Sequence, residues 1–249
     1  MGHAQPMRFH NNRPKKLIRL RWWHRLAYIS RVLPRRLDEL IRSLDVAPSA
    51  RVLDFGCADA PYRSSFPTTV EYLSADLPGN PKATLTIDDE GCLPLDDATV
   101  DFVLSTQVLE HVADPAVYVA ECFRVLKPGG QLLLSTHGIM IYHRDPVDYW
   151  RWTSEGLERQ LALAGFELRP IIGIMGLAAT GLQFFQDATF IHVPRIIRPL
   201  YLLLFQGVIA VCDRFTSELS KRLNSLVIVA VGHKPAVNPV QKSGSYPAS

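Results

Sequence analysis

Two carboxylates stand at the ends of successive apolar runs, and their types and spacing indicate a nucleotide site. Asp54 follows Val52-Leu53, Asp76 follows Val70–Ala75, and Gly56 begins a turn of small residues between them. A small-residue turn after a buried strand lets backbone N–H groups approach a ligand. A carboxylate at a strand end can accept two hydrogen bonds from a ribose diol. These residues are therefore expected at the carboxyl edge of an open α/β sheet.

Two classes of cofactor use such an edge, and the turn distinguishes them. The dinucleotide fingerprint requires the pattern G-x-G-x-x-G, but here only Gly56 is present, because Ala58 and Pro61 follow it. The stretch Asp54–Ala60 instead resembles the first motif of class I S-adenosylmethionine-dependent methyltransferases, commonly D-x-G-x-G-x-G. Alanine replaces glycine at two positions, and each alanine costs about 1 kcal/mol if the loop demands positive φ there.

Further segments extend the resemblance along about two thirds of the chain. The segment Val108–His111, followed by Asp114-Pro115, is similar to the family's segment after the fourth strand, and Arg124–Gly130 is similar to its turn into the fifth. The segments that also fit are Leu93-Pro94, Asp148–Thr153 and Gly165-Phe166. The resemblance implies an α/β fold, a Rossmann-like three-layer sandwich. Its seven-stranded sheet is mostly parallel, with the last strand antiparallel.

The apolar periodicity predicts the elements that must position these residues. The expected strands are 51–55, 70–75, 83–87, 100–105, 131–136, 166–172 and 225–231. Helices are expected from Asp114-Pro115 to about Leu126 and from Ser154 to about Ala164. Before the first strand, the apolar positions of 17–44 predict two amphipathic helices separated at Pro34.

Length and composition predict one large domain with flanking segments, since 249 residues at 47% hydrophobic content can bury a core. Residues 1–48 form a basic N-terminal arm with helices, 49–234 the methyltransferase domain, and 235–249 a disordered tail. Residues 176–222 form an apolar helical insertion between strands 6 and 7, divided into short helices by Pro194 and Pro199.

The resemblance implies S-adenosyl-L-methionine as cofactor and assigns residues to its parts. Asp54 and the turn face the methionine portion, Asp76 binds the ribose, and Asp88 or Asp89 accepts from the adenine amino group. The backbone of Thr106 and Gln107 forms the floor near the methyl group. The full set of expected cofactor-binding residues is Asp54, Gly56, Cys57, Ala58, Asp76, Leu77, Asp88, Asp89, Thr106, Gln107 and His111.

Methyl transfer depends mostly on alignment, but an oxygen or nitrogen nucleophile also calls for a base, for which histidine is suited. His143 is the first candidate, because Asp145 and Asp148 stand near enough in sequence to orient it. His137, at the end of the fifth strand, is the second. The alternative is that this polar loop only shapes the entrance to the pocket. No cysteine or histidine spacing indicates a metal site.

Charge and hydropathy are unevenly distributed. Residues 1–51 carry twelve Lys and Arg against three acids, whereas the rest is mildly acidic. Such an arm favours an anionic partner, or is simply a solvated segment. The run Leu200–Cys212, about thirteen residues, is too short to span a bilayer. The insertion can therefore be a lid, a homodimer interface or a peripheral membrane contact.

The sequence thus predicts a methyltransferase acting on an unidentified small-molecule or lipid-linked acceptor by O- or N-methylation. The alternative is a non-catalytic, cofactor-binding partner protein on the same fold. Nucleic acid is not an expected acceptor, because no RNA-binding module adjoins the fourth strand. Unpaired cysteine spacing and the lack of an N-terminal apolar segment favour a cytoplasmic location, with contact at the inner membrane face left open.

Overall fold

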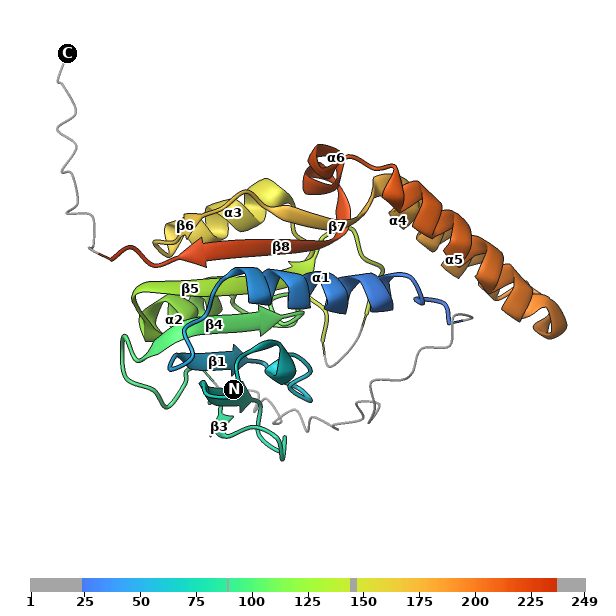
Figure 1. Cartoon of the computed structure of the whole chain (residues 1–249). Coiled ribbons are helices and arrows are strands. Elements are labelled where there is room, and N and C mark those ends of the chain that lie inside the picture. The colour runs from blue at the N-terminus through green and yellow to red at the C-terminus, as the bar shows by residue number, and fades with distance from the viewer. Residues whose placement is uncertain (1–23, 89, 144–146, 237–249) are drawn as a thin grey trace, which may run out of the picture.

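A single mixed sheet forms the centre of the computed structural model, which describes residues 24–88, 90–143 and 147–236 (Figure 1). The strand order is β3-β2-β1-β4-β5-β8-β6, with β7 also paired to β8. The strands are β1 (Arg51–Phe55), β2 (Glu71–Asp76), β3 (Leu85–Thr86), β4 (Val100–Thr106), β5 (Leu126–His137), β6 (Glu167–Leu168), β7 (Ile172–Gly176) and β8 (Ser225–His233). β1 to β5 pair in parallel, and β8 runs antiparallel to its neighbours.

Helices cover both faces of the sheet, which gives the expected three layers. The helices are α1 (Ile29–Ser43), α2 (Pro115–Val125), α3 (Ser154–Leu163), α4 (Leu177–Phe190), α5 (Arg198–Arg214) and α6 (Glu218–Leu223), with 3-10 turns η1 (Arg63–Ser65) and η2 (Arg195–Ile197). Leu53 and Val103 pack in the core that includes α2 and α3, whereas Val52 and Leu104 pack in the core that includes α1. This alternation follows from the two-residue repeat of a strand.

The expected sixth strand is interrupted. β6 and β7 both pair with β8 on the same side, Leu168 opposite Gly232 and Ile172 opposite Val229. Pro170 lies in the gap between them and has no backbone N–H to give to a ladder. The two short strands are therefore one edge strand with a break.

The expected helix break at Pro34 is wrong, because α1 continues through it. A proline inside a helix costs about 3 kcal/mol. Beyond it, Leu37 and Ile41 are fully buried against the sheet, and burying such side chains contributes about 1.5–3 kcal/mol each. Burial therefore offsets the lost hydrogen bond, and the helix continues to Ser43.

The insertion forms a helical hairpin that projects from one end of the sheet (Figure 1). Pro194 separates α4 from the short turn before α5, as expected. Pro199 does not divide the segment, because it lies in the first turn of α5, where a missing N–H costs nothing. Among the described residues one stretch, Arg195–Arg214, has the length and hydropathy to cross a membrane, with 22% of its most apolar window buried. The helical stretch is thus longer than the thirteen residues expected.

Candidate active site

The loop after β1 adopts the backbone geometry that its motif requires. Gly56 has φ +82°, and a Cβ there would lie 2.4 Å from Val108 Cγ2. Ala58 and Ala60, which replace two glycines of the motif, have φ +47° and +50°. The loop therefore demands positive φ at both alanines, and each costs about 1 kcal/mol. Only a residue without a side chain fits at Gly56.

Asp76, at the end of β2, is hydrogen-bonded to this loop. Its Oδ2 accepts from the Ala58 N–H at 3.1 Å and from the Asn80 side-chain amide at 2.6 Å, and its Oδ1 accepts from the Leu77 N–H at 2.8 Å. The same Asn80 amide donates to the Ala58 carbonyl at 2.8 Å. Sequence reasoning missed Asn80, whose signal is its place in a Gly-Asn-Pro turn four residues after Asp76.

Asp54 is buried beside Asp76. The Tyr72 O–H donates to its Oδ2 at 2.6 Å. Burial raises the Asp54 pKa to about 6; the Tyr72 hydrogen bond opposes the rise and the Asp76 charge adds to it. Such a carboxylate gains from an ammonium partner, which fits the expected methionine end of a cofactor. The same carboxylate links β1 to β2 through Tyr72, and this structural role is compatible with ligand binding.

The other expected cofactor residues surround this centre. Asp88 Oδ1 accepts from the backbone N–H groups of Glu90 and Cys92, at 3.1 and 2.7 Å, so it closes its own loop. Asp89 lies outside the described residues. Gln107 follows β4 with φ +56°, and its amide donates to Ser135 Oγ at 3.2 Å. The side chains nearest the expected cofactor differ in character: Leu77 is exposed, Thr106 half-buried, and Cys57 a buried thiol whose pKa burial raises to about 12.

Three histidines converge at the neighbouring strand ends. His111 follows β4, His137 ends β5, and His143 lies in the next loop. Their ring centroids are 6.2 Å apart for His111 and His137, 5.8 Å for His111 and His143, and 5.9 Å for His137 and His143. The sequence named each residue but did not predict that they meet. No group of described side chains has the arrangement to hold a metal ion.

Glu110 lies buried beneath the histidines and was missed by sequence reasoning. Its Oε2 accepts from the Thr136 hydroxyl at 2.9 Å, and its Oε1 lies 3.2 Å from His137 Nε2 without the alignment of a hydrogen bond. Burial raises the Glu110 pKa to about 7. Burial first, then the charges of Arg151, His143 and His111, lowers the His137 pKa to about 3. Glu110 Oε1 and His137 Nδ1 have no hydrogen-bond partner in the described chain.

Asp148 does not orient the His143 ring, contrary to the expectation. It accepts from the His143 backbone N–H at 2.7 Å, and both its oxygens receive the Arg151 guanidinium at 2.5 Å. This ion pair lowers the Asp148 pKa to about 2. Arg151 also donates to the carbonyls of Met140 and Ile141, so the pair holds the backbone of the His143 loop. Asp145, the other expected partner, lies outside the described residues.

Comparisons with known proteins relate the sequence and the fold of this chain to methyltransferases. Residues 53–134 match the family model of a methyltransferase domain. A probable S-adenosylmethionine-dependent methyltransferase of Mycolicibacterium smegmatis is 42% identical over 33% of this chain and 34% of its own length. A ubiquinone biosynthesis O-methyltransferase of Xanthomonas oryzae is 32% identical over 51% and 62%.

Residues 53–134 thus match a methyltransferase domain, and S-adenosylmethionine-dependent methyltransferases are among the proteins that this chain resembles. Solved structures share its fold: a putative methyltransferase of Bacillus halodurans has a TM-score of 0.52 at 18% identity, covering 81% of this chain and all but 1% of its own. The [4+2]-cyclase SpnF has a TM-score of 0.53 at 19% identity, with 81% of each chain covered. The fold alone therefore does not fix the activity.

The matched part of the methyltransferase domain does not include the whole site. It contains the loop after β1, Asp76 and His111, whereas His137, His143 and the hairpin lie beyond residue 134. The curated relatives named above are also matched over less than two thirds of their length. The matched part thus includes the expected cofactor half of the site and His111, whereas His137 and His143 lie outside it.

Proposed function

We propose that the chain binds S-adenosyl-L-methionine at the loop after β1 and methylates an oxygen or nitrogen of a small-molecule or lipid-linked acceptor at the histidine cluster. The observation that carries the proposal is the adjacency of the two halves. Val108 packs on Gly56, and Glu110 and His111 follow it two and three residues later in sequence. The tight turn at Gly56 and the Asp76 carboxylate fit the cofactor, because the first admits only backbone and the second can accept from a diol.

When bound, the cofactor supplies an electrophilic methyl group on a sulfonium. Asp54 would pair with its α-ammonium and Asp76 with the ribose, while the backbone at Gln107 closes the floor. His143 is the exposed member of the cluster and meets the acceptor first. It would receive the proton of the acceptor's hydroxyl or amine, while the methyl group would pass from the sulfonium to the acceptor and leave its bonding electron pair on a neutral thioether. His137 is neutral at pH 7, because its pKa is about 3, and it adds no positive charge beside the sulfonium.

The cytoplasm is the proposed compartment, supported by four free cysteines with no disulfide among them. A lipid-linked acceptor is supported by the apolar hairpin next to the site-bearing end of the sheet (Figure 1). The other candidate function is a non-catalytic partner protein, favoured by the alanines at Ala58 and Ala60, which strain the loop.

Two measurements test the proposal. Isothermal titration with S-adenosylhomocysteine should show binding. Incubation with methyl-labelled cofactor and a cell extract should then label a small or lipid-soluble product. Binding without labelled product under conditions where a known methyltransferase labels its own acceptor supports the non-catalytic function. Absence of binding overturns both.

A further inference from the structure

The hairpin of α4 and α5 has a polar inner side that ties it to the domain. The side-chain amides of Gln183, Gln186 and Gln206 all donate to the Arg25 carbonyl, at 3.0, 2.8 and 2.9 Å. Gln206 Oε1 accepts from the Tyr28 N–H at 2.7 Å. These three glutamines are buried. The hairpin is therefore fixed in place by the segment that precedes α1.

A second anchor holds the base of the hairpin. Asp213 accepts from the Tyr28 hydroxyl at 2.6 Å and from the Gly176 N–H at 2.8 Å. Its side chain is buried, and Lys221 lies 3.8 Å away. With both ends returning to strands β7 and β8, the hairpin is a rigid projection of the domain.

The outer side of the hairpin is apolar and exposed. In α5 the exposed side chains follow one helical stripe, with Leu200 57% and Leu204 60% exposed. The stripe and its flanks comprise Leu177, Phe185, Ile191, Ile196, Ile197, Leu200, Leu203, Leu204, Val208, Val211 and Phe215. No Lys, Arg, Asp or Glu occurs between Arg198 and Asp213. A contiguous apolar surface of this kind marks an interaction site.

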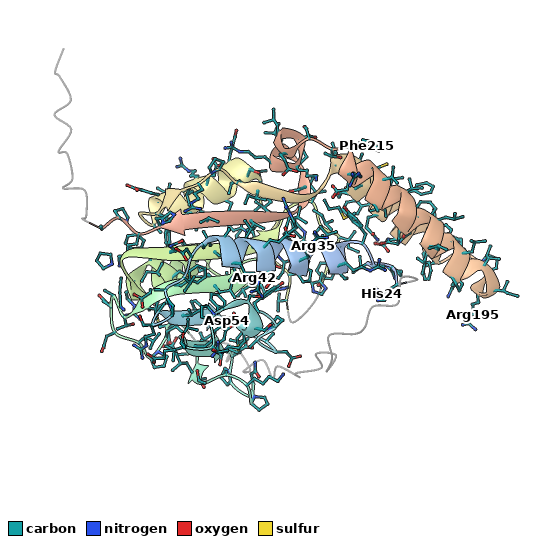
Figure 2. The ribbon with its side chains drawn as sticks, in the orientation of Figure 1. His24, Arg35, Arg42, Asp54, Arg195 and Phe215 are labelled. Carbon is teal, nitrogen blue, oxygen red and sulfur yellow. The ribbon has the colours of Figure 1, made fainter. Side chains whose placement is uncertain are left out.

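The charges at the surface of η2 and α5 are positive, whereas Glu218 at the start of α6 is exposed and lies 3.5 Å from Lys221. Arg195 and Arg198 stand at the tip and Arg214 at the base, and Figure 2 labels Arg195 and Phe215 at these two ends. Arg198 lies over the Phe190 ring, 4.9 Å from its centroid. The acidic residues of α4 and α5 do not face this surface as exposed charges. Asp213 is buried, and the nearly buried Asp187 pairs with Arg25 at 2.9 Å.

We propose that this apolar stripe docks on the surface of an anionic lipid bilayer, with the arginines at its two ends meeting lipid phosphates. A second copy of the chain would bring arginine toward arginine at the ends of a parallel stripe, whereas anionic headgroups complement both ends. The inference does not depend on the methyl transfer proposed above.

The stripe lies along the membrane plane rather than across it. Although the stretch Arg195–Arg214 has the length and hydropathy to cross, crossing would carry the buried glutamines and the Arg25 carbonyl into hydrocarbon. In-plane docking keeps that network on the protein side and immerses only the exposed stripe.

Co-sedimentation with vesicles tests the proposal. The full chain should pellet with vesicles of phosphatidylglycerol and phosphatidylcholine, stay in the supernatant with phosphatidylcholine alone, and be released as salt rises. Leu204→Glu with Val208→Glu should lower the vesicle partition coefficient about tenfold or more. Arg195→Gln and Arg198→Gln should each lower it roughly fivefold.

Matched controls separate the stripe from general surface effects. Leu163→Glu changes a leucine that is 71% exposed on α3, and Arg159→Gln changes an exposed arginine on the same helix. Both should bind vesicles like the wild type, and thermal melting verifies that all variants fold. Three results would overturn the proposal: no binding of the wild type to anionic vesicles at low salt, undiminished binding of the double glutamate variant, or a dimer that this variant converts to monomer.

Discussion

The two halves of the site, at the carboxyl edge of the sheet, differ in how completely their buried polar groups are hydrogen-bonded. On the cofactor side, Asp76 is hydrogen-bonded by the loop and Asn80, and Asp54 by Tyr72. On the histidine side, Glu110 Oε1 and His137 Nδ1 are buried without a hydrogen-bond partner in the described chain. An unsatisfied buried group costs about 1–3 kcal/mol.

This difference distinguishes a preformed site from an incomplete one. A ligand entering at Asp76 must exchange hydrogen bonds that the protein already makes. A ligand that binds at the histidines meets buried polar atoms that lack hydrogen-bond partners. New hydrogen bonds to these atoms favour its binding. The histidine side, where we propose that the acceptor binds, therefore leaves buried polar atoms unsatisfied, which costs stability. The following predictions test this contrast.

The largest expected effect is on turnover at the histidine side. His143→Ala should reduce turnover about 10²-fold if the ring takes the acceptor's proton, with affinity for S-adenosylhomocysteine unchanged. Steady-state rates with an identified acceptor and isothermal titration measure the two quantities. His192→Ala, an exposed histidine on the hairpin, is the matched control. A His143→Ala rate equal to wild type removes this residue from the chemistry.

The next effect is on cofactor affinity. Asp76→Ala should weaken binding of S-adenosylhomocysteine by about 1.5–3 kcal/mol, because a charged acceptor is lost. Isothermal titration gives the affinity. Asp59→Ala, in the same loop but exposed and paired with Lys82, is the control and should bind normally. Equal affinities for Asp76→Ala and wild type would place the ribose elsewhere.

The pH dependence of the free energy of unfolding should reveal the raised pKa of Glu110. Its folded pKa, about 7, lies above the unfolded value near 4.5, so the folded state holds the proton more tightly. The carboxyl's contribution is fully present below pH 4.5 and is lost as pH rises through 7. The free energy of unfolding of wild type minus that of Glu110→Gln should therefore fall by on the order of 2 kcal/mol over this range.

Urea unfolding of both proteins at several pH values measures this difference. His137 titrates in the opposite sense: its folded pKa is lowered to about 3, so its contribution is lost as pH falls below 6.5. His111, His143, Asp148 and Arg151 also face the cluster, but all of these groups are common to both proteins. A difference that stays constant with pH would show that Glu110 keeps an ordinary pKa.

The smallest effect concerns the strain in the cofactor loop. Ala58→Gly should raise the free energy of unfolding by up to about 1 kcal/mol, because glycine adopts positive φ without steric cost. Ala113→Gly, at an exposed loop position outside the positive-φ set, should instead lower it by a few tenths. Chemical denaturation compares the two. A loss of stability in Ala58→Gly would mean that the alanine is not strained.

The sequence predicted what depends on local pattern. Strand β1 has the expected bounds, and Asp54, Gly56 and Asp76 meet at one edge because parallel strands end together. The break at Pro34 was wrong because helix propensity is local, whereas the burial of Leu37 that outweighs it is tertiary.

Convergence between distant segments could not be predicted. Periodicity gives no distance between His111 and His143. Glu110 is only part of the segment after the fourth strand until the structure shows its contacts with Thr136 and His137. Likewise the glutamines of the hairpin interrupt an apolar run without any sign of their common acceptor at Arg25.

That common acceptor has a consequence for the order of events during synthesis. The hydrogen bonds from Gln183 and Gln206 to the Arg25 carbonyl bridge 158 and 181 residues of chain. At ribosomal speeds of about 5–20 residues per second, Arg25 emerges roughly ten to thirty seconds before the first of its partners. Strand β8 lies later still, so the sheet and the hairpin anchor are completed in the same closing interval. Because Gln206 lies within the part of α5 that bears the apolar stripe, the stripe and its anchoring network become complete together.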